Sequence, residues 1–183
     1  MQDEFVALFC RKDSAYKKRP HWNVYDIDRD AKTYNGTEPV VCHPPCRAWG
    51  IMKHLANPRP GERELAIWSI EKIKENGGIL EHPKTSGIWK YINIGTTIEI
   101  DQYDFGHVAH KPTKLWIYPL MEMQLPPLPG KDTSIHLCEK GYRRSINGNV
   151  EGTKNCTQYM REYTPEKLID WFEETLRRIK NAK

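Results

Sequence analysis

The stretch Pro39-Val40-Val41-Cys42-His43-Pro44-Pro45-Cys46, taken together with Ile79-Leu80-Glu81-His82-Pro83, decides the fold. Residues 39–42 and 79–81 are apolar runs of the length of a buried strand. Between them, residues 62–75 place Ala66, Ile67, Ile70 and Ile73 at helical spacing, and Asn76-Gly77-Gly78 supplies a helix stop. A strand, a helix of this length and a second strand predict a right-handed crossover, and therefore two parallel strands.

Further elements flank this unit on both sides. Apolar runs bounded by turns predict strands at residues 5–9, 23–27, 96–101 and 115–118. Thr164-Pro165-Glu166 opens a last helix with an N-cap followed by proline, and its apolar stripe consists of Leu168, Trp171, Phe172, Thr175, Leu176 and Ile179. We therefore expect a compact α/β, Rossmann-like fold with a mostly parallel sheet flanked by helices.

The length of 183 residues suits a single domain. We expect its core at residues 1–122, followed by a proline-rich linker at 123–130. Residues 131–183 then form a polar loop and the C-terminal helix. Loops as long as 131–162 are usually functional or disordered.

Composition excludes several classes of protein. Apolar residues make up 38% and charged residues 28% of the chain, which fits neither a disordered nor a fibrous protein. No run approaches the roughly 18 apolar residues of a membrane span, and the first five residues lack the pattern of a signal peptide. We therefore expect a cytoplasmic protein with no membrane partner, whose five cysteines stay free thiols.

Basic residues gather at 11–19, 111–114, 143–144 and 177–178, although the net charge is only +4. Such clusters favour a phosphate-bearing partner, either DNA or a nucleotide. Scattered basic residues are nevertheless more often a solvated surface.

The loop His43-Pro44-Pro45-Cys46-Arg47 is the candidate functional centre, because ligands bind outside the carboxyl ends of parallel strands. Two prolines stiffen the turn, and Arg47 with a helix beginning near Ala48 would favour a Cys46 thiolate. A packed, purely structural Cys46 is the competing interpretation. Zinc binding by Cys42, His43 and Cys46 is disfavoured, because no second Cys/His pair follows, and we predict no metal site.

Glu81 ends the neighbouring strand, so it should emerge at the same edge of the sheet as Cys46. A carboxyl group beside a thiol suits addition to a heterocycle, because it binds or protonates a ring nitrogen while the sulfur attacks carbon. A helix cap or a surface ion pair is the alternative role for Glu81.

Four segments in order resemble the cytosine-C5 DNA methyltransferases. Pro44-Pro45-Cys46, with Trp49-Gly50 after it, is similar to their Pro-Pro-Cys loop, and Glu81-His82-Pro83 is similar to their Glu-Asn-Val motif. Asp104-Phe105-Gly106, then residues 110–117, resemble their Asp-Tyr-Gly segment with its basic stretch and strand. Residues 26–31 resemble the acidic strand end that holds the cofactor ribose. The chain also resembles short phage-encoded proteins with the same Pro-Pro-Cys-Arg-Ala-Trp-Gly and Glu-His-Pro segments.

The resemblance implies a reaction and a set of site residues. Cys46 would add to C6 of a flipped-out cytosine while Glu81 holds N3 and the exocyclic amine, before S-adenosylmethionine methylates C5. The substrate would be bound by Pro44, Pro45, Arg47, His82, Lys111 and Lys114. Asp26 and Asp28 would lie at the cofactor.

The loop after the first strand departs from the family pattern, which has a glycine-rich turn there. Here the loop reads Cys10-Arg11-Lys12-Asp13-Ser14-Ala15-Tyr16 and contains no glycine. Arg11, Lys12, Asp13 and Ser14 suit a phosphate better than a thioether cofactor. The sequence therefore leaves the cofactor unassigned, with S-adenosylmethionine as the one that the resemblance implies.

Three functions stay open at this point. The first is a phage-type enzyme that modifies a pyrimidine of DNA or of a nucleotide in the host cytoplasm, with Cys46 attacking the ring and Glu81 assisting. The second is a non-catalytic phage protein that binds a nucleotide or nucleic acid, for example to counter host defence. The third is a protein that only binds partners. Trp49, Trp89 and Trp116 either stack on a base or, as is commoner, belong to the core.

Overall fold

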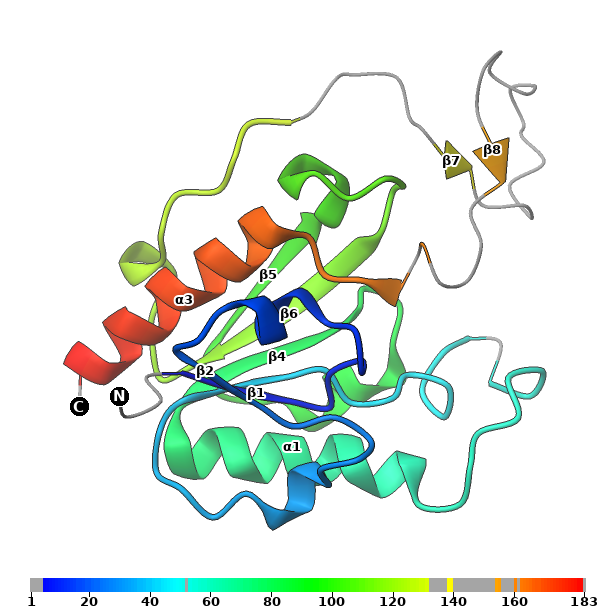
Figure 1. The fold of residues 1–183 in the computed structure, drawn as a ribbon, viewed down its shortest axis with the longest axis horizontal. Coiled ribbons are helices and arrows are strands. Elements are labelled where there is room, and N and C mark those ends of the chain that lie inside the picture. The colour runs from blue at the N-terminus through cyan, green and yellow to red at the C-terminus, as the bar shows by residue number, and fades with distance from the viewer. Residues whose placement is uncertain are drawn as a thin grey trace.

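The computed structural model describes residues 5–51, 53–131, 138–139, 154–155, 160 and 162–182. A six-stranded sheet forms its centre, with helix α1 (Glu62–Asn76) on one face and helix α3 (Glu166–Asn181) on the other (Figure 1). The strands of the sheet are β1 (Phe5–Leu8), β2 (Trp22–Val24), β3 (Val40–Cys42), β4 (Gly78–Pro83), β5 (Thr96–Asp101) and β6 (Pro112–Tyr118). Strands β7 (Cys138–Glu139) and β8 (Lys154–Asn155) pair separately. Most of the predicted loop 131–162, including Arg143 and Arg144, lies outside the described residues.

The sheet is mixed, with strand order β2-β1-β3-β4-β6-β5. Strand β1 pairs in parallel with β2 and β3, and β3 with β4, whereas β6 runs antiparallel to both β4 and β5. The expected α/β class is confirmed, but the expectation of a mostly parallel Rossmann-like sheet is not. The physical reason lies in residues 102–111, which join β5 to β6 without a crossover helix, and such a connection favours antiparallel neighbours.

Helix α1 connects β3 to β4, as the apolar spacing predicts. Among the described residues, the other connections contain only short 3-10 helices, namely η1 (Ala15–Lys18), η2 (Ala31–Thr33), η3 (Gly87–Tyr91), η4 (Gln102–Phe105) and η5 (Glu122–Gln124). The prediction of a helix beginning near Ala48 is wrong, because the described residues from 47 to 56 form turns. Helix α3 begins after Pro165, so Pro165, and not Thr164, is the residue at its N-cap.

Strand alternation divides the core into two apolar clusters. Val41 and Ile79 belong to the cluster that contains Phe172 of α3, whereas Cys42 and Leu80 belong to the cluster on the α1 side. Because successive side chains of a strand point to opposite faces, neighbouring residues of β4 belong to different surroundings. This alternation decides which residues of the predicted motifs reach the candidate site.

Gly78 joins α1 to β4 at a position that no other residue could fill. Its backbone has a φ of 149°, and a Cβ atom there would lie 2.1 Å from the carbonyl oxygen of Val40. The close approach allows β4 to pair with β3 directly after the helix. The described part of the chain contains no helix that is long and apolar enough to span a membrane.

Candidate active site

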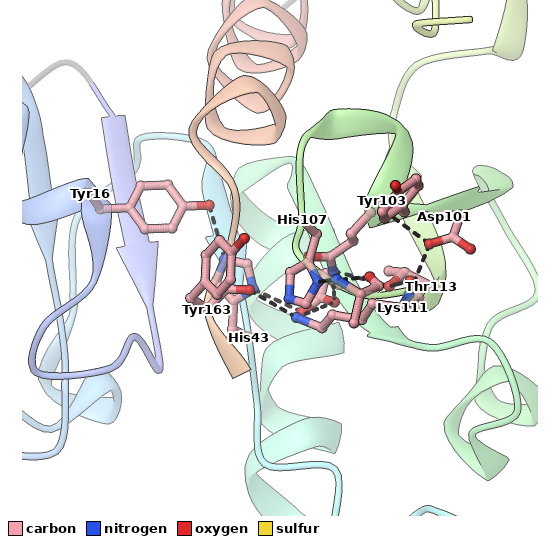
Figure 2. Close-up of polar contacts among 11 residues, drawn as sticks. Tyr16, His43, Asp101, Tyr103, His107, Lys111, Thr113 and Tyr163 are labelled. Carbon is pink, nitrogen blue, oxygen red and sulfur yellow. Dashed lines mark hydrogen bonds and ion pairs between the residues drawn. The ribbon is translucent and has the colours of Figure 1, made fainter. Parts of the chain in front are cut away.

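A cleft of about 1050 Å³ opens at the carboxyl ends of β1, β3 and β4, on the side of the sheet that α3 covers. Three strand ends contribute to its wall: residues 9–11 and 13–16 after β1, residues 43–47 after β3, and Glu81 and Pro83 on β4. Residues 107–113 and the segment 162–166 before α3 close the opposite side. Figure 2 shows how Tyr16, His43, Lys111 and Tyr163 gather from these separate parts of the chain.

Pro44, Pro45, Cys46 and Arg47 all line this cleft, as predicted for the loop after β3. Cys46 is exposed. Partial desolvation nevertheless raises the pKa of its thiol, and the charge of Glu81 raises it further, while Lys111 opposes the shift. The expectation that Arg47 favours the thiolate is not supported, because Nε of Arg47 lies 3.1 Å from Oε2 of Glu62, so its charge is neutralised at the start of α1.

Glu81 is the centre of a hydrogen-bonded cluster. Its Oε2 lies 3.0 Å from Nδ1 of His43, and its Oε1 accepts a hydrogen bond of 2.7 Å from Nε2 of Gln102. Nζ of Lys111 lies 4.0 Å from Oε1. Burial alone would raise the pKa of Glu81, but the charge of Lys111 and the hydrogen bond from His43 lower it to about 2. Glu81 is therefore a carboxylate at neutral pH, and it is neither a helix cap nor a surface ion pair.

The cluster extends in both directions from Glu81. On one side, Nε2 of His43 lies 3.0 Å from the hydroxyl of the buried Tyr16. On the other, Gln102 donates to Oγ1 of Thr113 at 3.0 Å, and Thr113 donates to the carbonyl oxygen of Lys111 at 2.9 Å. Sequence reasoning missed Tyr16, Gln102 and Thr113, because nothing in their spacing indicates that η1, η4 and β6 meet at this point.

The segment before α3 forms a second wall that sequence reasoning also missed. The ring of Tyr163 stacks on His107 with centroids 4.4 Å apart, and its hydroxyl accepts a hydrogen bond of 3.0 Å from the backbone N–H of Val108. Its carbonyl oxygen accepts a hydrogen bond of 3.3 Å from Nζ of Lys111. Glu162 also lines the cleft and adds to the negative potential at Cys46.

Two predicted substrate-binding residues lie elsewhere. His82 follows Glu81 on β4 and points to the α1 side, where it is 1% exposed and makes an edge contact with Trp89. Neither imidazole nitrogen has a hydrogen bond of good geometry. Lys114 pairs with Glu99 at 3.4 Å and does not line the cleft. Because strand residues alternate in direction, His82 and Lys114 cannot reach the site that Glu81 and Lys111 line.

The loop after β1 is divided in the same way. Arg11, Asp13 and Ser14 line the cleft, and Arg11 forms an ion pair of 2.9 Å with Asp13. Lys12 points away and pairs with Asp28 at 2.8 Å. Binding of a phosphate by Arg11 or Lys12 would therefore have to displace a carboxylate.

The three tryptophans belong to the core and not to the cleft. Trp49 and Trp116 are buried in the cluster beneath α1, and Trp89 packs against that cluster. The commoner of the two expectations for these residues is confirmed. Tyr163, which lines the cleft, is the aromatic residue that we consider instead for stacking on a ligand there.

The residues present do not fit S-adenosylmethionine. Asp26, expected at the ribose, is 7% exposed; its Oδ1 accepts hydrogen bonds from the backbone N–H groups of Asp28 (2.9 Å) and Arg29 (3.2 Å), and its Oδ2 pairs with Lys17. Phe9, directly after β1, has a left-handed backbone with φ of 61°, which glycine would adopt more readily, and its ring packs against Trp68 of α1. We derive no methyl transfer from this site.

Within the described residues, no three His, Cys, Asp or Glu side chains are arranged to hold a metal ion. Cys42 is buried on the α1 side, whereas His43 and Cys46 line the cleft. No protein-family model matches the sequence, and no curated protein matches it.

Proposed function

We propose that the protein is an enzyme that modifies a pyrimidine base of DNA or of a nucleotide, with Cys46 adding to the ring and Glu81 assisting. One observation carries the proposal: Cys46 and Glu81, delivered by the adjacent parallel strands β3 and β4, line the same cleft. A thiol and a carboxylate at a strand-end cleft are the two groups that such an addition needs. The mixed sheet would then be a shortened Rossmann-like, methyltransferase-like fold, working in the cytoplasm where its substrate occurs.

Glu81 suits recognition of a ring that carries an exocyclic amine. A carboxylate has about four acceptor positions, and two of those on Glu81 accept from His43 and Gln102. The remaining positions can accept from an amino group, as a carboxylate does from N4 of cytosine. An oxygen at that place on the ring would instead meet a negative charge, so an aminopyrimidine is favoured over an oxopyrimidine.

The addition can be written without a further reactant. The Cys46 thiol releases its proton to solvent, the Sγ–C6 bond forms, and the electron pair of the C5–C6 double bond takes a proton from solvent at C5. In the reverse direction the original C5 hydrogen leaves to solvent as a proton, its electron pair re-forms the C5–C6 double bond, and the Sγ–C6 bond breaks to release the Cys46 thiolate, so the pyrimidine returns with its C5 hydrogen exchanged. The raised pKa of Cys46 lowers the fraction of thiolate available for the addition at neutral pH.

The turns that follow Cys46 support a phosphate-bearing substrate. Residues 47–61 contain no acidic residue and include Lys53 and Arg59, besides Arg47, whose charge is paired with Glu62. Ile51 and Leu55 in the same stretch are 70% and 65% exposed. A basic stretch with exposed apolar side chains, directly beside the cysteine, suits a DNA or nucleotide backbone.

The first experiment measures deuterium uptake at C5 of deoxycytidine, deoxycytidine monophosphate and a cytosine-containing oligonucleotide in D₂O. We expect the wild-type protein to catalyse exchange and Cys46→Ala to abolish it with the fold intact. Cys10→Ala is the matched control, because Cys10 lines the same cleft and burial strongly raises the pKa of its thiol. Exchange that persists in Cys46→Ala would disprove the proposed role of the cysteine.

A non-catalytic binding function is the second candidate, and the raised pKa of Cys46 is the observation that favours it. In that case no pyrimidine exchanges its C5 hydrogen, and Cys46→Ala binds the same bases as tightly as the wild type does. Loss of binding in Lys53→Gln or Arg59→Gln, growing smaller at high salt, would then locate the backbone contact.

A further inference from the structure

His43 lies between two groups that come from different parts of the chain. It follows β3, and its ring is held between Glu81 on β4 and Tyr16 in η1, with 3.0 Å on each side. The side chains of His43 and Glu81 are each 11% exposed, and Tyr16 is fully buried. Buried polar groups of this kind are expensive unless every hydrogen bond is made, so the arrangement is specific and not accidental.

The directions of these hydrogen bonds follow from the chemistry of the three groups. An ionised carboxylate only accepts, so Nδ1 of His43 carries the hydrogen and donates to Oε2 of Glu81. In the neutral ring, Nε2 is then an acceptor, and the hydroxyl of Tyr16 donates to it. The other neutral tautomer would place a lone pair of Nδ1 against the carboxylate. The carboxylate of Glu81 therefore selects the tautomer with the hydrogen on Nδ1, and Tyr16 satisfies the other ring nitrogen.

We propose that His43 is a positioning residue for Glu81: its Nδ1–H, held in place by Tyr16, orients the carboxylate so that the free acceptor positions face the base in the cleft. The proposal rests on the proposed function for the identity of that base. Gln102 fixes the second oxygen of the same carboxylate, so the plane of the group is held from both sides. A side chain with three rotatable bonds would otherwise lose this orientation.

Two substitutions of His43 separate its two hydrogen bonds. In His43→Asn the amide NH₂ occupies about the place of Nδ1 and still donates to Glu81, but the contact with Tyr16 is lost. In His43→Gln the amide reaches about the place of Nε2 and still meets Tyr16, but the donor to Glu81 is lost. Both variants keep a neutral polar side chain, so they form a matched pair.

Deoxycytidine C5 exchange is measured for both variants, with kcat and KM determined separately. We expect His43→Asn to stay within about tenfold of the wild type, and His43→Gln to lose about 100-fold in kcat/KM, as supporting residues typically do. Equal losses in the two variants, with equal losses of stability, would overturn the proposal, because a merely structural histidine does not distinguish its two nitrogens.

A second readout does not depend on activity. The carboxyl carbon of Glu81, followed by ¹³C NMR during an acid titration, reports its protonation directly. We expect its pKa to stay well below the ordinary value in His43→Asn and to rise in His43→Gln. If no base exchanges but this difference is found, the proposed function fails and the positioning role stands. If the base exchanges and His43→Gln changes neither the rate nor the titration, the positioning role fails and the proposed function stands.

Discussion

Glu81 and His82 are neighbours on β4, both are titratable, and both are largely buried, yet their surroundings give them opposite properties. Glu81 keeps its charge, because His43, Gln102 and Lys111 surround it on the cleft side. His82 packs against Trp89 on the α1 side, and burial lowers its pKa to about 4 against the opposing effects of Glu81 and the Pro45 backbone. Burial alone thus does not decide whether a group is charged. The charged groups and hydrogen-bond partners around the buried group decide it.

The difference also separates a functional position from a structural one. A carboxylate held by donors on both oxygens is oriented to bind a ligand, whereas the imidazole of His82, with no hydrogen bond of good geometry, contributes mainly packing against Trp89. The resemblance to the methyltransferase motif includes both residues in one tripeptide. In the structure, only the first and third residues of Glu81-His82-Pro83 line the cleft.

The largest expected effect is a loss of stability in acid that occurs in two separate steps. His82 has a folded pKa of about 4, below its ordinary 6.5, so the unfolded chain binds the proton first and stability falls as the pH drops from about 6.5 to 4. Glu81 has a folded pKa of about 2, below its ordinary 4.5, so its contribution is present above about 4.5 and is lost as the pH falls towards 2. Each step amounts to roughly 3 kcal/mol.

Urea unfolding between pH 7.5 and pH 2 measures both steps. We expect His82→Leu to remove the upper step and Glu81→Gln to flatten the lower one. Because the charge of each group shifts the pKa of the other, the step that remains should also move in each variant. If His82→Leu leaves the fall between pH 6.5 and 4 unchanged, the contrast between the two faces of β4 is wrong.

A smaller effect concerns the reactivity of Cys46. Desolvation is the main cause of the raised pKa of this thiol and the charge of Glu81 is the second, so Glu81→Gln should lower the pKa and increase the fraction of thiolate at neutral pH. The rate of alkylation by iodoacetamide between pH 7 and 10 measures the change. Glu99→Gln is the control, because Glu99 is an exposed carboxylate on β5 that pairs with Lys84. An equal increase in that variant would show that net charge, and not Glu81, controls the thiol.

The smallest expected effect is a gain of stability on the α1 side. Leucine has about the volume of histidine and no polar atom to leave without a partner, so His82→Leu should raise the free energy of unfolding at pH 7.5 by about 1 kcal/mol. Urea denaturation is the measurement, with His82→Asn as a variant that stays polar and should be less stable than wild type. A destabilised His82→Leu would indicate that the ring itself, against Trp89, is the stabilising feature.

Several features of the fold could be predicted from local sequence. Helix α1 lies where Ala66, Ile70 and Ile73 repeat, because helical periodicity is a property of consecutive residues. Strands β3 and β4 are parallel, since a helix of that length joins them. The meeting of Cys46 and Glu81 at one edge of the sheet follows from the same unit.

Other features depended on residues that are distant in the chain. Strand β6 lies between β4 and β5, an order that no local pattern reports, and it makes the sheet mixed. Arg47 pairs with Glu62 rather than assisting Cys46, and Asp26 pairs with Lys17. Each of these pairings required a partner whose position the sequence does not specify.

The sequence by itself determined the elements, the strand-helix-strand unit and the two residues that the unit delivers to its edge, because these follow from periodicity and chain connectivity. Only the tertiary structure decided that His43 and Tyr16 support Glu81 and that His82 faces away, since Tyr16, His43 and Glu81 come from three separate segments. Hydrogen-bond direction and burial are properties of atoms brought together by packing, so they are decided when the sheet and its covering helices assemble.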